Sequence, residues 1–129
     1  MATDSVDVFI VVEQEIQAVF RISGSLDPAI LEEIFGAKVH ARGGNAGTSV
    51  CEIFTIKERT TDAVSHVEAL LTMVRPHLGE LRALVVKDSL DVDVILLISG
   101  WPDGESLYLD AIRVAELASI GAGLEVVRI

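Results

Sequence analysis

The chain alternates between two hydrophobic periods, and each change of period marks the boundary of a predicted element. Runs rich in β-branched apolar residues predict strands over 6–12, 16–22, 37–42, 50–56, 92–98 and 124–129. The acidic stretch Glu13-Gln14-Glu15 separates the first two runs. Because no Gly or Pro marks a tight turn there, the two runs could form a hairpin or one long, bent strand.

Apolar residues at helical spacing predict helices between these strands. A short helix is predicted from Ala29 to Phe35. Asp27 is a suitable N-cap for it, Pro28 fits its first position, and Gly36 ends the pattern. The last helix is predicted over 109–120.

A longer helical region begins at Thr60-Thr61-Asp62 and carries one apolar stripe. The stripe consists of Val64, Val67, Leu70, Leu71 and Val74. Pro76 should end or kink the helix near Arg75, because proline disfavours helical geometry in the residue before it. Helical spacing resumes up to Lys87. The region is therefore either two helices or one helix that continues past a kink.

The same tripeptide occurs near both ends of the chain. Ile22-Ser23-Gly24 and Ile98-Ser99-Gly100 each follow an apolar run and precede a predicted helix that stops at a glycine. These two strand–turn–helix–strand units predict an internal pseudo-repeat. The full order of elements predicts one α+β domain over residues 1–129. Its nearest simple model is ferredoxin-like, with a mixed or antiparallel sheet and helices mainly on one face.

Composition adds a prediction about association. Of the 129 residues, 50% are apolar, although the chain has only four Phe, one Tyr and one Trp. A domain of this size buries roughly two-thirds of its unfolded surface. Because the apolar content exceeds what such a domain readily hides, we expect a homodimer, the commonest soluble oligomer.

Charge and cysteine content restrict the partners and the compartment. The formal net charge is −10 and the basic residues are scattered, which disfavours nucleic acid as a partner. Cys51 is the only cysteine, as is usual in a reducing compartment. The apolar runs are too short to cross a membrane. We therefore expect a soluble, cytoplasmic protein that does not bind membranes.

Several of these segments resemble a bacterial family known as domain of unknown function 4279. The matching residues are Ile22-Ser23-Gly24, Leu26-Asp27-Pro28, Ile30, Gly36, His66, Leu70-Leu71, Leu117-Ala118 and Gly121. The family usually carries a tryptophan near its third strand, where this chain has Ile53-Phe54. The resemblance implies no established activity and no catalytic residues. Some small domains of this kind look like immunity proteins of toxin systems.

A second resemblance covers about a quarter of the chain. Residues 24–37, with Asp27-Pro28 and Ile34-Phe35-Gly36-Ala37, look like the first turn and helix of ACT-type regulatory domains. Those domains hold a small effector at the turn between strand and helix. The resemblance implies a ligand-sensing role.

No residue pattern predicts catalysis, a metal or a cofactor. His40, His66 and His77 lack the helical spacing of metal ligands, and we interpret them as surface or half-buried histidines. Cys51 lies in a predicted strand among apolar residues, which indicates a buried, inert thiol. The glycine-rich stretch 43–47 lacks the Lys-Ser/Thr pair and the following helix of a phosphate loop. We therefore predict a protein without enzymatic activity.

Two functional hypotheses follow, each with its own candidate binding residues. The first is a protein-interaction module, of the immunity type, whose acidic face is centred on Trp101 and meets a basic protein. The carboxylates of that face are Asp88, Asp91, Asp93, Asp103 and Glu105. The alternative is a small-ligand sensor that holds its ligand at the Ser23-Gly24 and Ser99-Gly100 turns.

Overall fold

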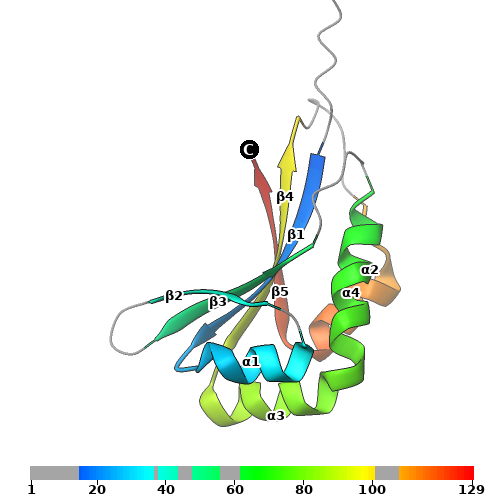
Figure 1. The fold of residues 1–129 in the computed structure, drawn as a ribbon. Helices are drawn as coiled ribbons and strands as arrows, with labels where there is room; N and C mark the ends of the chain where they lie inside the picture. Colours follow the sequence, from blue (N-terminus) through cyan, green and yellow to red (C-terminus); the bar gives the residue numbers. More distant parts are fainter. Residues whose placement is uncertain (1–14, 37, 44–47, 56–61, 101–107) are drawn as a thin grey trace, which may run out of the picture.

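The central element of the fold is a five-stranded mixed sheet, seen in a computed structural model that describes residues 15–36, 38–43, 48–55, 62–100 and 108–129 (Figure 1). The strands are β1 (Glu15–Gly24), β2 (His40–Gly43), β3 (Ser49–Phe54), β4 (Asp91–Ser99) and β5 (Ala122–Arg128). Their order across the sheet is β2-β3-β1-β4-β5. Neighbours pair antiparallel except β4 and β5, which are parallel. The predicted α+β class and mixed sheet are therefore confirmed.

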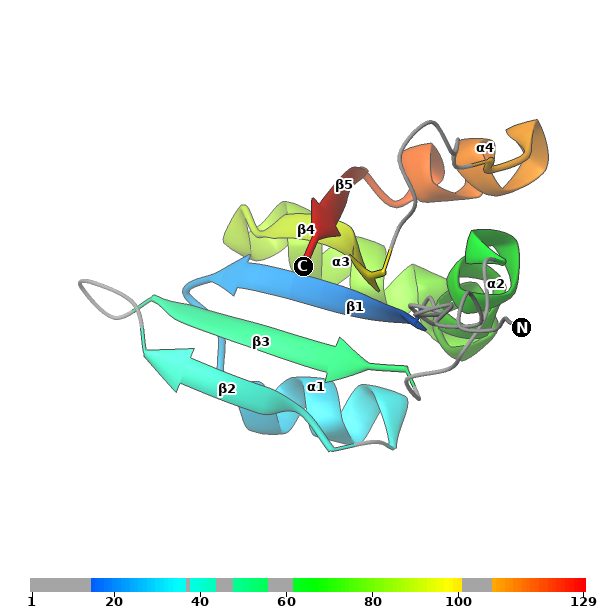
Figure 2. The same cartoon turned by 90° about the horizontal axis from the view of Figure 1, so that it is seen from above.

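The helices cover one face of this sheet (Figures 1 and 2). They are α1 (Pro28–Phe35), α2 (Ala63–Val74), the 3₁₀ turn η2 (Arg75–His77), α3 (Leu78–Asp88) and α4 (Ala111–Ser119). Each α-helix contributes buried side chains, such as Leu31, Val67, Leu81 and Leu117, to one contiguous core with the sheet. No helix among the described residues is long and apolar enough to cross a membrane.

Alternation along the two central strands directs apolar side chains into this core. The inward residues are Ile16, Ala18, Phe20 and Ile22 of β1 and Val92, Val94, Leu96 and Ile98 of β4. On the opposite face, Val19 pairs with Ile95 and both are also buried. Burial on both faces explains why apolar residues run on at these positions instead of alternating strictly.

The predicted ends of α1 are confirmed. The Asp27 carboxylate accepts a hydrogen bond from the Ala29 N–H, and Pro28 occupies the first turn. Gly36 closes the helix with φ of 62°, in the left-handed region that glycine adopts without strain. The question at Pro76 is also settled, because α2 ends at Val74 and α3 follows the 3₁₀ turn.

Some predicted boundaries shift for identifiable reasons. β2 begins at His40 because Val39 turns into the core and its N–H donates to Glu32 Oε1. α4 begins at Ala111 because Asp110 caps it through the Arg113 N–H. The strand predicted over 6–12 lies outside the described residues.

The two units of the predicted pseudo-repeat differ in arrangement. In the first unit, β3 lies between β1 and β2. In the second, β4 and β5 are direct neighbours and pair in parallel. Each unit is a strand, a helix and a strand, but the connection in the first unit crosses over another strand.

Candidate binding sites

The two Ser-Gly turns lie on neighbouring strands of the same sheet, at opposite ends. Ser23 pairs with Asp91, whereas Ser99 pairs with Glu15. The stretch of β1 from Glu15 to Ser23 corresponds to about 27 Å of strand. The structure therefore does not bring Ser23-Gly24 and Ser99-Gly100 together as one small-molecule site.

The glycines of these turns have a structural explanation. Gly24 has φ of 144° and Gly100 has φ of 68°, both in the region that side chains disfavour. A Cβ atom on Gly24 would also lie 2.6 Å from Cδ2 of Leu90. Glycine at the end of β1 thus lets the chain turn against the residue that precedes β4.

Three of the five carboxylates of the predicted acidic face are among the described residues. Asp88 is the last residue of α3, and Asp91 and Asp93 lie at the start of β4. The Asp93 carboxylate accepts a hydrogen bond of 3.4 Å from Arg21 on β1. Trp101, Asp103 and Glu105, which completed the predicted acidic face, lie outside the described residues.

A groove of about 550 Å³ runs between α1 and α3. Ile30 and Ile34 of α1 face Ala83 and Leu84 of α3 across it. Ile34 and Leu84 pack against the core, while Ile30 remains 41% exposed. The groove therefore has an apolar floor that no described part of the chain covers.

The groove also has charged and aromatic edges. Its lining includes the carboxylates of Glu33 and Glu80 together with Lys87 and His77. The His77 ring packs edge-to-face on Phe35 with 5.9 Å between ring centroids, and its Nδ1 lies 3.6 Å from Glu80 Oε1. Helical spacing in the sequence predicted that Ile30 and Ile34 share a face. It could not reveal that α3 would lie beside them.

A second, smaller pocket of about 340 Å³ lies between the end of β3 and α2. Its apolar walls come from Ile53, Phe54, Ala69, Leu70 and Met73, and its polar groups from Thr55, Ser65 and His66. The pocket lies beyond the end of β2, whose pairing with β3 reaches only Glu52.

His66 corrects one interpretation made from the sequence, because its side chain is buried instead of surface or half-buried. Only 3% of it is exposed. The buried stripe of α2 includes Ala63 and His66, whereas Val64 is only half-buried. His66 Nδ1 lies 3.1 Å from Thr55 Oγ1. The buried ring therefore has a polar partner in the residue that follows β3.

The Thr55 hydroxyl that contacts His66 is itself held by the sheet. Its Oγ1 accepts a hydrogen bond of 2.9 Å from the Ala18 N–H and lies 3.3 Å from the Ala18 carbonyl oxygen. Gln17 Nε2 donates to the Thr55 carbonyl oxygen. These bonds tie the end of β3 to β1 and link both strands to α2.

Cys51 is buried, as its apolar surroundings predicted. Only 1% of its surface is exposed. Burial raises the pKa of the thiol, and the charge of Asp27 adds to this effect. A raised pKa keeps the sulfur in the unreactive thiol form. Among the described residues, no three His, Cys, Asp or Glu side chains are grouped as metal ligands.

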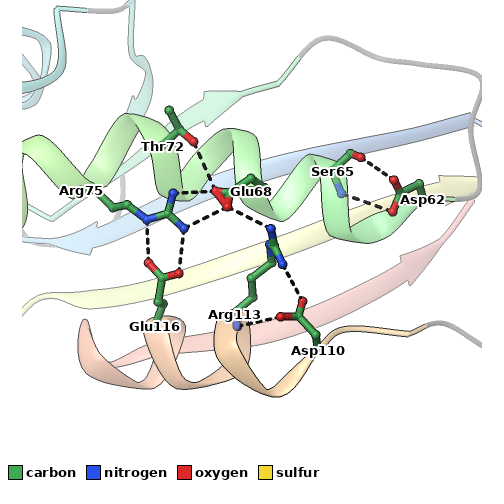
Figure 3. Close-up of polar contacts among 8 residues, drawn as sticks. All are labelled: Asp62, Ser65, Glu68, Thr72, Arg75, Asp110, Arg113 and Glu116. Carbon is green, nitrogen blue, oxygen red and sulfur yellow. Dashed lines mark hydrogen bonds and ion pairs between the residues drawn. The ribbon is translucent and has the colours of Figure 1, made fainter.

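An ion network joins α2 and its following turn to α4 (Figure 3). Arg75 donates to Glu68 at 2.6 Å and to Glu116 at 2.7 Å. Arg113 bridges Glu68 and Asp110, at 3.0 Å from each. Hydrogen bonding from Arg75 lowers the pKa of Glu68 to about 2 and also lowers the pKa of Glu116. We call these five residues the α2–α4 ion network.

Comparisons of the chain with protein family models, with curated proteins and with solved structures returned no match. The two resemblances drawn from the sequence therefore stay predictions. The fold and the sites described above carry the functional argument.

Proposed function

We propose that this protein is a non-enzymatic interaction module that binds a basic, amphipathic segment of another protein in the α1–α3 groove. The observation that carries the proposal is the apolar floor of the groove between the carboxylates of Glu33 and Glu80. An immunity protein of a toxin system would be one module of this class.

We also propose that the first part of the chain has the ferredoxin-like arrangement expected from the sequence, extended by α4 and β5. In support, β1 to β4 are ordered β2-β3-β1-β4 and all their neighbouring pairs are antiparallel. α1 connects β1 to β2, and α2 with α3 connects β3 to β4. In this arrangement the two connections lie on the same face, where α1 and α3 form the groove.

The chemistry of the groove defines the segment that fits it. A helix with an apolar stripe would cover Ile30, Ile34 and Leu84, since helices dock in apolar grooves through residues at helical spacing. Basic residues flanking that stripe would meet Glu33 and Glu80. The net charge of −10 would attract such a segment from a distance and raise its association rate.

The experiment uses a fluorescein-labelled amphipathic helical peptide of Leu and Lys, about 15 residues long so that it spans about 22 Å. Anisotropy at low and high salt gives its affinity. Reversing both rim charges with Glu33→Lys and Glu80→Lys should weaken binding about tenfold, because each exposed charge pair contributes up to about 1 kcal/mol.

A matched control separates the groove from general attraction. The pair Glu15→Lys and Asp91→Lys changes the net charge equally but lies on β1 and β4, outside the groove lining. It should change the affinity less than threefold. Equal weakening by both pairs, or equal binding of a Leu and Glu peptide, would overturn the groove proposal.

The pocket between β3 and α2 favours a second candidate, the ligand-sensing role implied by the ACT-type resemblance. Its volume of about 340 Å³ is within the range of small-molecule sites, which combine apolar walls with a few polar groups. Thr55 and His66 would orient a compact ring that carries one hydrogen-bonding group.

Indole and phenol are suitable probes for this second candidate. A ligand that binds only the folded state stabilises it, so the melting temperature should rise with probe concentration. Ala69→Phe should abolish the rise, because Ala69 lines the pocket and is exposed at its surface. No rise with either probe, or a rise that Ala69→Phe leaves intact, would reject this candidate.

A further inference from the structure

Among the described residues, β5 forms a long, open edge of the sheet. Its seven residues pair with β4 on one side. The Ile129 N–H donates to the Ile98 carbonyl oxygen at 2.9 Å. Because backbone groups along a strand point to alternate sides, those of Leu124 and Val126 point away from β4. An edge with outward N–H and C=O groups is a template for another strand.

The side chains along this edge are apolar and exposed. Leu124 pairs with Val94 and Val126 with Leu96, so both are on the face that the helices cover elsewhere. They nevertheless remain 44% and 39% exposed. α4, which packs beside β5, leaves Ile112 72% exposed. In the part of the chain that the structure describes, the helix layer therefore ends before the edge of the sheet and leaves an apolar strip uncovered.

The opposite edge of the sheet is protected. β2 has four residues, His40 to Gly43, all of them exposed. His40 and Arg42 place polar side chains along it, and short polar edge strands resist pairing with other chains. The contrast indicates β5, and not β2, as the edge suited to association.

Local charge identifies the occupant of this edge. The whole chain has a net charge of −10, so two copies repel each other over most of their surfaces. Residues 111–129, which comprise α4 and β5, contain two arginines and two glutamates and are therefore neutral. Two copies that meet here bring neutral surfaces together and keep their acidic surfaces apart, whereas a basic partner gains no local attraction from it.

We propose that the protein is a homodimer in which β5 of one copy pairs antiparallel with β5 of a second copy. A two-fold axis makes this contact self-complementary, since each strand presents the same outward groups to the other. The two sheets would join into one continuous sheet. Leu124 and Val126 of one copy would then pack against the same row of the other.

The test is the mass of the purified full chain in solution, measured by light scattering over a dilution series. The wild type should have twice the 13.8 kDa of one chain at high micromolar concentration. Val126→Lys should give the monomer mass with unchanged circular dichroism, because a lysine on an edge strand opposes pairing. The control Ala41→Lys on the β2 edge should remain dimeric.

Hydrogen exchange of the wild type provides a readout that does not depend on any variant. The Leu124 and Val126 N–H groups should exchange slowly in concentrated protein and at least tenfold faster after dilution to the monomer. A monomer mass at all concentrations would overturn the proposal. So would a dimer that Val126→Lys leaves intact, or fast exchange of both groups in the concentrated sample. Loss of peptide binding in the α1–α3 groove would not affect these results.

Discussion

At the scale of single residues, Gly24, His66 and Thr55 each have a structural role. Gly24 turns the chain against Leu90. Its positive φ costs little because glycine has no Cβ, and the same φ would strain any other residue. The buried His66 and the half-buried Thr55 form a polar pair that ties α2 to the end of β3. The glycine of the first Ser-Gly turn and the buried histidine are thus explained by their structural roles, without a ligand.

Replacing Gly24 with alanine should therefore destabilise the fold. The new Cβ would lie 2.6 Å from Leu90 Cδ2 and would need φ of 144°. We expect the free energy of unfolding in urea to fall by about 1–3 kcal/mol. Gly79→Ala is the control, because a Cβ there meets nothing within 4 Å. Because Gly79 lies in a helix, its replacement by alanine should raise the free energy of unfolding by up to about 1 kcal/mol. Equal effects at both sites would contradict this explanation.

Among the elements, α4 depends on charge for part of its attachment. Leu117 is the buried residue of α4, and Arg113 and Glu116 link the helix to Glu68 and Arg75 through the α2–α4 ion network (Figure 3). Arg82 on α3 adds a bond from its Nε to the Ser119 carbonyl oxygen. A helix held in this way should respond to pH more than the rest of the core.

Arg75→Gln should lower the melting temperature by a few degrees at pH 7 and by much less at pH 2. The pKa of Glu68 falls from an ordinary 4.5 to about 2 through its bond to Arg75. A carboxylate whose pKa is lower in the folded state stabilises the fold above its unfolded pKa. That contribution disappears as the pH falls from about 4.5 to about 2. Melting curves followed by circular dichroism across this range measure the difference.

Arg82→Gln provides the matched control for this effect. Arg82 Nε donates to the backbone carbonyl oxygen of Ser119, which does not titrate. The difference in melting temperature between Arg82→Gln and the wild type should therefore stay constant with pH. A constant difference for Arg75→Gln as well would show that the ion network contributes nothing pH-dependent to the attachment of α4.

On the scale of the whole molecule, the two proposed interaction surfaces are built from different elements. The groove is formed by α1 and α3 with η2, whereas the open edge is formed by β5 beside α4. The chain is strongly acidic, yet its last 19 residues, 111–129, are neutral. An acidic groove and a neutral edge suit a basic partner and a second copy, respectively. Variants at one surface should leave the measurement at the other unchanged.

Much of the architecture follows from local sequence. Asp27, Pro28 and Gly36 define α1 because capping and turn preferences act within a few residues. Periodicity identified β1, β4 and the helical region around Pro76, since the faces of a strand or helix repeat along the chain. The α+β class and the burial of Cys51 also follow from these local patterns.

Tertiary structure alone decided how these elements meet. Antiparallel pairing of β1 with β4 separated two identical tripeptides, because strand direction is set by long-range connections and not by local residues. Packing of α3 beside α1 created the groove at Ile30, and the order of the described strands placed β5 at the edge of the sheet. His66 entered the core because the facing surface of α2 depends on what it packs against. Such contacts join residues far apart in the chain, and periodicity within one element carries no information about its neighbours.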